Sequence, residues 1–584
     1  MSDSLRQGPL GSAEATPWVI FGASAGGVIL FALGWLGASV AGWMCGHGYS
    51  PPPFDGASFF TLLKHGPQPL WPHVPGGELI AGIIGGEGLG LALLVATMGW
   101  IWHHLGHPLG LARPSDVRHL RQRAMAKRAK QMRPSLSGPV PLQQIGILLG
   151  RMGRRLQLFS SWEDVILAIM GPRAGKTAGI AVPAILAAPG AVMATSNRAD
   201  VMQITKAERA KAGKIWQFDP QGIAFSEQTM WWDMISQART VEGAQRLAGC
   251  FVSVAADASY RHDFWFGAAR NTLTSLLHAA AVGGYTVLDV LAWLANPLDR
   301  DPIKALEEAR MHALAAQLTG TIAGAPETRD GIYETSRQCV ACLLDPRIAA
   351  WVTPQDNMDR FDPIDFVTTR DTLYLLSKDG GGSAAGLVTA ATDAVLQAAI
   401  YEAECQGGRI DPPFLPMLDE CANIARIEDL PDLYSHLGSR SIPIVSILQS
   451  YRQGVKAWGE AGMDAMWSAA TTKLLGAGLD DADFAAKISL LIGDHEIWRR
   501  STSFGGSSGH SNSVQPHDKR ALQASDVRMM KKGTALLLAT GTRIARITLF
   551  QWHQGKDAAR LGAAAKTEQK AIQARAIKAR EARR

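Results

Sequence analysis

The fold is decided by the stretch DVILAIMGPRAGKT, which runs from Asp164 to Thr177. Its first half is an apolar run of strand length that ends at Met170, and a glycine-containing loop follows directly. The next residues, 178–188, have the apolar composition of a buried helix. The order strand, loop, helix predicts a phosphate-binding loop, because backbone N–H groups and the start of a helix converge there on phosphate oxygens.

The residue types in this loop match nucleotide chemistry. The loop consists of Gly171, Pro172, Arg173, Ala174, Gly175, Lys176 and Thr177. We expect Lys176 to reach the β- and γ-phosphates of ATP and Thr177 to bind Mg²⁺. The usual signature begins with glycine where this chain has Met170, but Gly175-Lys176-Thr177 after a buried strand disfavours a chance match.

A second strand predicts the acidic partner of the loop. The apolar residues 413–418 end at Asp419 and Glu420, whereas a purely structural strand end is the alternative interpretation. We assign Asp419 to the metal ion and Glu420 to the general base that activates water. Further apolar runs lie at 191–194, 214–218, 372–376, 443–448, 535–538 and 544–550. Because helical stretches alternate with the earlier runs, the fold class is α/β with a largely parallel sheet covered by helices.

Two apolar stretches near the N-terminus, Trp18–Cys45 and Leu79–Trp102, are long enough to cross a hydrocarbon layer of roughly 30 Å. The loop between them has one Lys/Arg, whereas residues 113–133 carry eight. The positive-inside rule therefore places everything after the second span in the cytoplasm. Small residues at 22 and 26 and at 82, 86 and 90 predict close helix packing and self-association in the membrane.

Composition excludes several classes of protein. With 584 residues, 47% hydrophobic and 19% charged, the chain buries sizeable cores and is not mainly disordered. Six cysteines are too few for a disulfide scaffold, and Cys339 and Cys342 are interpreted as packing residues in a helix rather than zinc ligands. The net charge of +6 resides in residues 556–584, which hold nine Lys/Arg against three acids. This tail is expected to be a solvated helix or free segment.

Several motifs occur in an order that resembles one family. The loop Arg173–Lys176 is followed by Val182-Pro183, by a strand that ends Ala194-Thr195-Ser196, and by Phe218-Asp219-Pro220. The acidic strand continues as Leu418-Asp-Glu-Cys-Ala-Asn423, and a later strand ends Leu448-Gln449-Ser450. Between about Ser161 and Trp552 the chain thus resembles the type IV secretion system coupling proteins, the TraG/TraD-like ATPases of conjugative DNA transfer.

The resemblance implies a membrane-anchored, RecA-like P-loop ATPase core with an inserted all-α domain and two N-terminal transmembrane helices. It implies a homo-hexamer that uses ATP and Mg²⁺ to pass DNA, expected to be single-stranded, with its relaxase into a secretion channel, from the cytoplasmic face of the plasma membrane. Gln449 would sense the γ-phosphate, and Arg440 would reach the neighbouring subunit's ATP. Ser439-Arg440-Ser441 departs from the glycine-flanked arginine that is common in the family, which leaves the identity of that arginine open.

The expected organisation follows from these assignments. It comprises a cytoplasmic N-terminus (1–16), a first transmembrane helix (17–46), an extracytoplasmic loop (47–78), a second transmembrane helix (79–103), a basic juxtamembrane linker (104–156), a nucleotide-binding core in two parts (157–256 and 346–552), an all-α insertion between them (257–345) and a basic C-terminal tail (553–584). The insertion is expected to hold helices at 264–282, 287–294, 302–318 and 328–344. The Gly/Ser-rich residues 501–512 are predicted to form a mobile loop.

Two other functions fit the same core. A membrane-anchored translocase for chromosomal DNA would favour four spans and a winged-helix reader, and a protein-secretion ATPase typically strings several ATPase modules together. The sequence carries one phosphate loop, which favours the coupling protein. A nucleotide-binding scaffold without motor activity is the remaining alternative.

Overall fold

The structure is a computed structural model that describes residues 16–49, 51–105, 111–136, 138–153, 155–256, 263–378, 383–505 and 509–582. The chain divides into two compact units, Met1–Leu109 and Gly110–Arg584. Each unit has its own buried cluster of apolar side chains. The units are therefore described separately.

The first unit is a hairpin of two long helices, α1 (Thr16–Met44) and α3 (Gly76–Leu105), with α2 (Gly56–His65) in the connection. Residues Gly26–Met44 and Gly76–Thr97 are long and apolar enough to cross a membrane. Trp35 and Trp71 anchor the connection, with ring centroids 4.9 Å apart, and Trp71 Nε1 donates to Ser39 Oγ at 3.2 Å. The two predicted spans thus coincide with two helices.

The glycines of these helices face each other within one chain. A Cβ on Gly37 would lie 2.2 Å from the carbonyl oxygen of Gly82, and a Cβ on Gly86 would lie 2.1 Å from that of Leu33. A Cβ on Gly90 would also meet Leu33 and Leu30. The close packing predicted for Gly82, Gly86 and Gly90 is therefore made inside the hairpin, against α1 of the same chain.

The second unit is built on an 11-stranded sheet, with strand order β2-β1-β15-β14-β11-β3-β10-β9-β4-β8-β5 among the described residues. From β11 to β5 all neighbours are parallel, whereas β14, β15, β1 and β2 continue the sheet in antiparallel fashion. In that order the strands are Leu156–Ser160, Ile147–Met152, Ala545–Thr548, Thr534–Ala539, Thr472–Gly476, Ile166–Ile169, Val445–Leu448, Leu415–Leu418, Val192–Ser196, Thr372–Leu376 and Ile215–Phe218. The predicted α/β class is confirmed, and the sequence did not predict β1, β2 or β11.

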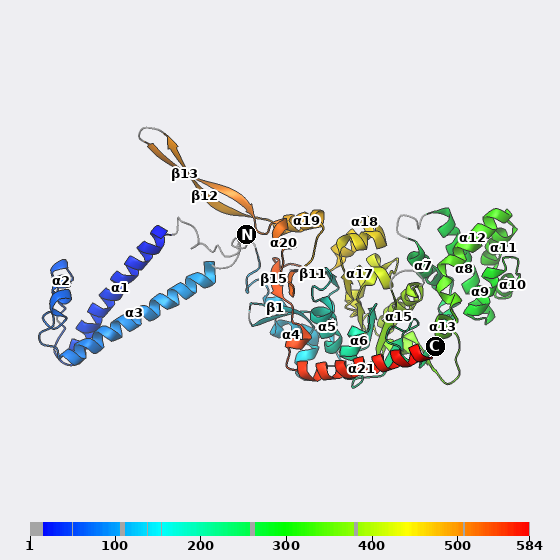
Figure 1. Cartoon of the computed structure of the whole chain (residues 1–584), viewed down its shortest axis with the longest axis horizontal. Coiled ribbons are helices and arrows are strands. Elements are labelled where there is room, and N and C mark those ends of the chain that lie inside the picture. Colours follow the sequence, from blue (N-terminus) through cyan, green and yellow to red (C-terminus); the bar gives the residue numbers. More distant parts are fainter. Residues whose placement is uncertain are drawn as a thin grey trace. The chain divides into compact units, whose positions relative to one another are not determined.

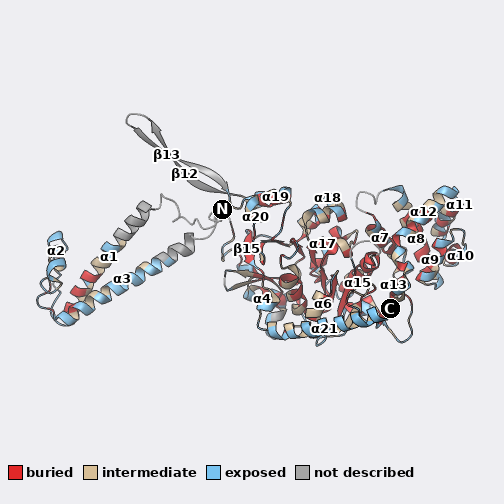
Figure 2. Ribbon diagram, viewed as in Figure 1, coloured by how far each residue is buried: buried red, intermediate tan, exposed pale blue. Residues whose placement is uncertain are grey.

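The central strands β3, β4, β8, β9 and β10 are buried along their whole length, as the red core in Figure 2 shows. Helices cover the sheet: α5 (Val182–Ala187), α6 (Asp200–Arg209), α14 (Pro363–Val367), α15 (Ala385–Cys405), α17 (Leu430–Leu437), α18 (Tyr451–Ala469), α19 (Ala482–Ile492) and α20 (Ala524–Arg528). Helix α15 is itself buried along most of its length, whereas α18 and α19 have exposed residues on their outer faces (Figure 2). Both faces of the parallel region are therefore dry, as an all-apolar strand pattern requires.

A helical subdomain gathers at one end of this unit, around the label α8 in Figure 1. It contains α8 (Phe264–Gly283), α9 (Val287–Ala295), α10 (Asp301–Glu308), α11 (His312–Ala323) and α12 (Pro326–Cys339). The preceding α7 (Val241–Ala255) packs against both α8 and α15 and so connects the subdomain to the core. The chain returns through α13 (Pro346–Ala349) and β7 (Asp359–Phe361), which pairs with β6 (Met230–Trp232) from before the subdomain.

Three predicted elements differ in detail. The helix expected over 302–318 is broken at Arg310, whose φ of 61° is incompatible with a continuous helix. The helix expected over 328–344 ends at Cys339 and continues as the short 3₁₀ turn Ala341–Leu344. The Gly/Ser-rich loop is instead part of a hairpin, β12 (Asp494–Gly505) and β13 (Gly509–Arg520), paired from Asp494↔Arg520 to Gly505↔Gly509. Of the predicted loop, 506–508 lie outside the described residues.

Both ends of this unit are folded onto the core. Within the expected linker 104–156, α4 (Gln122–Met132) buries Met125 and Ala129, and Arg133 pairs with Asp411 at 3.6 Å. The C-terminal tail forms α21 (Ala558–Glu581), which packs along α6. Glu568 on α21 accepts from Lys206 of α6 at 3.2 Å and from Arg575 at 3.1 Å. The basic residues of α21 thus belong to a docked helix.

Candidate nucleotide site

The phosphate loop lies at the carboxyl end of β3. Pro172 and Arg173 form its exposed tip, and Arg173 and Gly175 have φ of 58° and 94°. The loop is fixed from two sides, because Gly171 N donates to Ala477 O at 3.0 Å and Gly533 N donates to Ala174 O at 3.2 Å. It leads into one π-helical turn, Thr177–Ala181, and then into α5.

Met170 fits where a glycine is usual because the neighbouring strand makes room for it. A Cβ on Gly476 of β11 would lie 1.9 Å from the Met170 side chain. The missing side chain at Gly476 therefore accommodates the one at Met170. On the other side, Gly171 and Gly478 approach each other so closely that a Cβ on Gly171 would meet the carbonyl oxygen of Gly478 at 2.5 Å.

The acidic pair meets the loop although more than 240 residues separate them in the sequence. Strands β3 and β9 both flank β10, so their carboxyl ends reach the same edge of the sheet. Lys176 Nζ lies 2.6 Å from Glu420 Oε1 and 3.9 Å from Asp419 Oδ1. Thr177 Oγ1 donates to Asp419 Oδ2 at 3.5 Å.

Gln449 completes this cluster from the end of β10. Its Nε2 donates to Glu420 Oε2 at 2.6 Å. Gln453, one turn into α18, accepts from Gln449 N at 2.8 Å and donates to Asn423 Oδ1 at 2.9 Å. Sequence reasoning gave no role to Asn423 or Gln453. The spacing of four residues between Gln449 and Gln453 at a helix start was the available signal.

The carboxylate of Asp419 has the surroundings that a bound cation requires. Burial raises its pKa to about 6, although the charge of Lys176 acts in the opposite direction. Its Oδ1 atom is buried and accepts no hydrogen bond from the described residues. A carboxylate oxygen and the Thr177 hydroxyl are hard oxygen ligands, so this pair fits Mg²⁺.

Glu420 stands in a constrained position between these groups. It adopts the left-handed conformation with φ 60° and ψ 37°, and its side chain is only 8% exposed. Lys176 and Gln449 hold one carboxylate oxygen each. Both carboxylate oxygens of Glu420 are therefore engaged by neighbouring side chains in this arrangement.

Arg440 lies away from this cluster. It ends the 3₁₀ turn Gly438–Arg440, which precedes β10 and thus sits at the amino ends of the parallel strands. Its guanidinium pairs with Glu404 at 3.4 Å and donates to His436 O at 3.4 Å. Within one chain the structure brings together Lys176, Thr177, Asp419, Glu420 and Gln449, but not Arg440.

Cys339 is buried and Cys342 is half-buried in the helical subdomain. Burial raises the pKa of Cys339 to about 12 and that of Cys342 to about 11. Among the described residues no group of three or more His, Cys, Asp or Glu side chains is arranged to hold a metal ion. The cysteines therefore pack in the helical subdomain as neutral thiols.

Residues 413–532 match the family model described as the TraM recognition site of TraD and TraG. The chain is 23% identical to the conjugal transfer protein TraG of Agrobacterium fabrum (strain C58 / ATCC 33970) over 68% of this chain and 61% of that protein. It is 22% identical to the protein VirD4 of Rhizobium radiobacter over 68% of this chain and 58% of that protein. In both comparisons the chain is similar to type IV secretion coupling proteins. The match spans about three fifths of the length of these relatives.

Solved structures agree with this family's fold. The bacterial conjugative coupling protein TrwBdeltaN70 superposes with a TM-score of 0.51 at 16% identity, covering 66% of this chain and 85% of that one. The plasmid coupling protein TrwB in complex with ADP and Mg²⁺ gives a TM-score of 0.50 at 14% identity, covering 67% and 85%. At this identity the likeness shows the fold alone, which this chain shares with TrwB over about two thirds of its length.

Proposed function

We propose that this coupling protein hydrolyses ATP with Mg²⁺ and uses the energy to recruit relaxase-bound DNA and pump it into a secretion channel. One observation carries the proposal: five groups of distinct chemical roles, from β3, β9 and β10, converge on one edge of the sheet. Lys176 would neutralise the phosphates, Thr177 and Asp419 would hold Mg²⁺, Glu420 would accept the proton of the attacking water, and Gln449 would report the γ-phosphate. That TrwB binds ADP and Mg²⁺ supports the choice of ligand.

The membrane and its partners belong to the same proposal. Helices α1 and α3 would span the plasma membrane, with the ATPase unit on the cytoplasmic side, because the basic residues follow α3. The match of residues 413–532 to a TraM recognition site supports a docking role for relaxosome proteins in this segment. In a hexameric ring, Arg440 would act in trans on the ATP of the next subunit, since it is remote from the site of its own chain.

Two other activities would use the same catalytic groups. A membrane-anchored ATPase for protein secretion, or one that translocates chromosomal DNA, would also need Lys176 and Glu420. The relatives named for conjugal transfer favour the proposed function over both.

The decisive experiment replaces Lys176 by alanine in the full-length, detergent-solubilised protein. ATPase activity, measured with and without single- and double-stranded DNA, and conjugative transfer should both be lost, because the phosphates lose their cation while no core residue changes. Lys211→Ala is the matched control, since Lys211 is exposed and pairs only with the adjacent turn at Glu208. Hydrolysis by Lys176→Ala at the wild-type rate would refute the ATPase.

Glu420→Gln separates binding from chemistry. The amide keeps the shape of the side chain but cannot accept a proton, so turnover should fall by about 10²- to 10⁴-fold while ATP binding is retained. A fluorescent ATP analogue measures the binding, and phosphate release measures the turnover. Unchanged turnover would remove Glu420 from the role of base.

A further inference from the structure

Glu420 has a backbone conformation that its own residue type does not favour. Its φ of 60° is left-handed, and glutamate has no local interaction that stabilises this region. Such conformations persist only where the surrounding structure imposes them. The contacts of the residues that follow Glu420 therefore fix its conformation.

The immediate support is α16 (Cys421–Ile424), for which Glu420 is the N-cap. Glu420 O accepts from Asn423 N at 2.9 Å and from Ile424 N at 3.3 Å. A helix of four residues is too short to be stable on its own, because its few hydrogen bonds do not offset the conformational entropy lost on nucleation. It needs support from outside.

Arg426 supplies part of that support, beside the packing of α16 on α15, α18 and β10. Its Nε donates to Ala422 O, one of the open carbonyls of α16, at 3.2 Å. Its Nη1 donates to Ser253 O at 3.4 Å and to Ala256 O at 3.5 Å, both at the end of α7. In return, Ser253 Oγ donates to Arg426 O at 2.7 Å. One guanidinium therefore joins the helix that carries Glu420 to the helix that connects the helical subdomain to the core.

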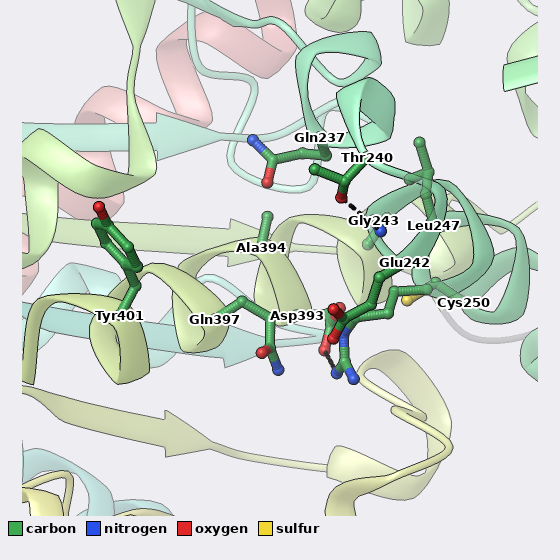
Figure 3. A pocket seen from close by; sticks show the side chains of 12 residues that line it. Gln237, Thr240, Glu242, Gly243, Leu247, Cys250, Asp393, Ala394, Gln397 and Tyr401 are labelled. Carbon is green, nitrogen blue, oxygen red and sulfur yellow. Dashed lines mark hydrogen bonds and ion pairs between the residues drawn. The ribbon is translucent and has the colours of Figure 1, made fainter. Parts of the chain in front are cut away.

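The next residues along the chain strengthen the same connection. Glu428 pairs with Arg270 of α8 at 2.9 Å, and Asp429 pairs with Arg246 of α7 at 2.8 Å. Arg246 also pairs with the buried Asp393 of α15, with Nε 3.0 Å from Oδ2. Figure 3 shows Asp393 beside Glu242 of α7, at a cavity of about 330 Å³ that Thr240, Glu242 and Gln397 help to line. Residues 426–429 are thus held by α7 and α8, and Trp458 Nε1 of α18 also donates to Ile427 O at 2.7 Å.

We propose that Arg426 is a positioning residue for Glu420, and that it makes the position of the catalytic base depend on how α7 is seated. The inference rests on the proposed ATPase function. Movement of α7, which packs against α8, changes the anchor of Arg426 and with it the support of α16. Hydrolysis is thereby coupled to the helical subdomain, while the phosphate loop, which is fixed by residues 477 and 533, is left in place.

The test compares Arg426→Ala with Arg337→Ala in the full-length protein. Arg337 is the matched control because it also joins helices, donating to Leu294 O at 3.1 Å and to Glu334, but it lies wholly in the helical subdomain. For Arg426→Ala, kcat should fall about 10- to 100-fold while KM for ATP changes less than about twofold, because small displacements of a catalytic group are costly. Arg337→Ala should keep the wild-type kcat.

A double-mutant cycle with Glu420→Gln shows whether Arg426 acts through the base. Once Glu420 is replaced, Arg426→Ala should lower kcat no further. An equal loss in both backgrounds, or a kcat for Arg426→Ala within twofold of wild type, overturns the inference. If Lys176→Ala also hydrolyses ATP normally, the proposed function fails instead.

Ser253→Ala covers the case in which Arg426→Ala does not fold. It removes the hydroxyl that donates to Arg426 O but leaves the guanidinium and its contacts. We expect kcat to fall about three- to tenfold with unchanged KM, and no further fall in the Glu420→Gln background. A wild-type kcat for Ser253→Ala together with a misfolded Arg426→Ala would assign both residues to stability alone and overturn the inference.

Discussion

Ser441 adopts a left-handed backbone conformation, which costs free energy for serine but not for glycine. Its φ is 58°, and its buried hydroxyl has no hydrogen-bond partner among the described residues. The left-handed conformation costs a non-glycine residue about 1 kcal/mol, and an unpaired buried hydroxyl costs about 1–3 kcal/mol. A glycine at position 441 would avoid both costs.

Ser441→Gly should therefore raise the free energy of unfolding by about 1 kcal/mol, after the entropy that glycine adds to the unfolded chain is subtracted. Urea unfolding followed by fluorescence measures the difference. Ser439→Gly is the control, because Ser439 is exposed in the preceding 3₁₀ turn and its replacement should destabilise slightly. A destabilised Ser441→Gly protein would show that the backbone there is not strained.

Two adjacent glycines of α3 differ in how closely α1 packs against them. A Cβ on Gly86 would lie 2.1 Å from Leu33 O, whereas a Cβ on Gly85 would have no atom within 4 Å. Gly86→Leu should push α1 and α3 apart and lower the aggregation temperature of the detergent-solubilised protein, while Gly85→Leu should not. Equal behaviour of the two variants would contradict the packing of α1 on α3.

The docking of α21 should depend on pH. Burial acts to raise the pKa of Glu568, but the hydrogen bond from Arg575 and the charge of Lys206 outweigh it, so the pKa lies below its usual value of 4.5. A lowered pKa means that the ionised group stabilises the fold above pH 4.5 and loses this effect as the pH falls through the lowered pKa.

Glu568→Gln should consequently lower stability by about 1 kcal/mol at pH 7 and have a shrinking effect below pH 4.5. Unfolding curves between pH 3.5 and 7 test this. The exposed Glu581→Gln near the end of α21 serves as control. If the loss of stability caused by Glu568→Gln were the same at every pH in this range, the charge of Glu568 would not be its cause.

For the whole molecule, the boundary between the units decides which fragments fold. Residues Leu111, Val117, Leu120 and Met125 belong to the core of the second unit. A fragment that begins at Gly110 should be stable, whereas one that begins at Gly138 should lose several kcal/mol, because each buried apolar side chain contributes about 1.5–3 kcal/mol. Thermal unfolding of both fragments measures this. If the two fragments were equally stable, residues 110–137 would be a linker that adds nothing to the stability of the second unit.

The sequence predicted the parts of the molecule whose signal is local. The phosphate loop is encoded within 14 residues as strand, loop and helix, and Asp419-Glu420 ends an apolar run. By contrast, Gly150 and Arg151 interrupt the pattern of β1, so this strand was missed. The role of Arg426 depends on where α7 lies in space, and no spacing in the sequence contains that information.

The strand order also has a consequence for synthesis on the ribosome. Strand β3 is complete at Ile169, but its neighbours β10 and β11 begin at Val445 and Thr472. At 5–20 residues per second, an apolar strand with both edges open waits about 15–55 s for its first partner. Meanwhile the helical subdomain, whose contacts are local, emerges and folds. The nascent chain thus carries an aggregation-prone segment for nearly half of its translation, and a holding chaperone would act on it during that interval.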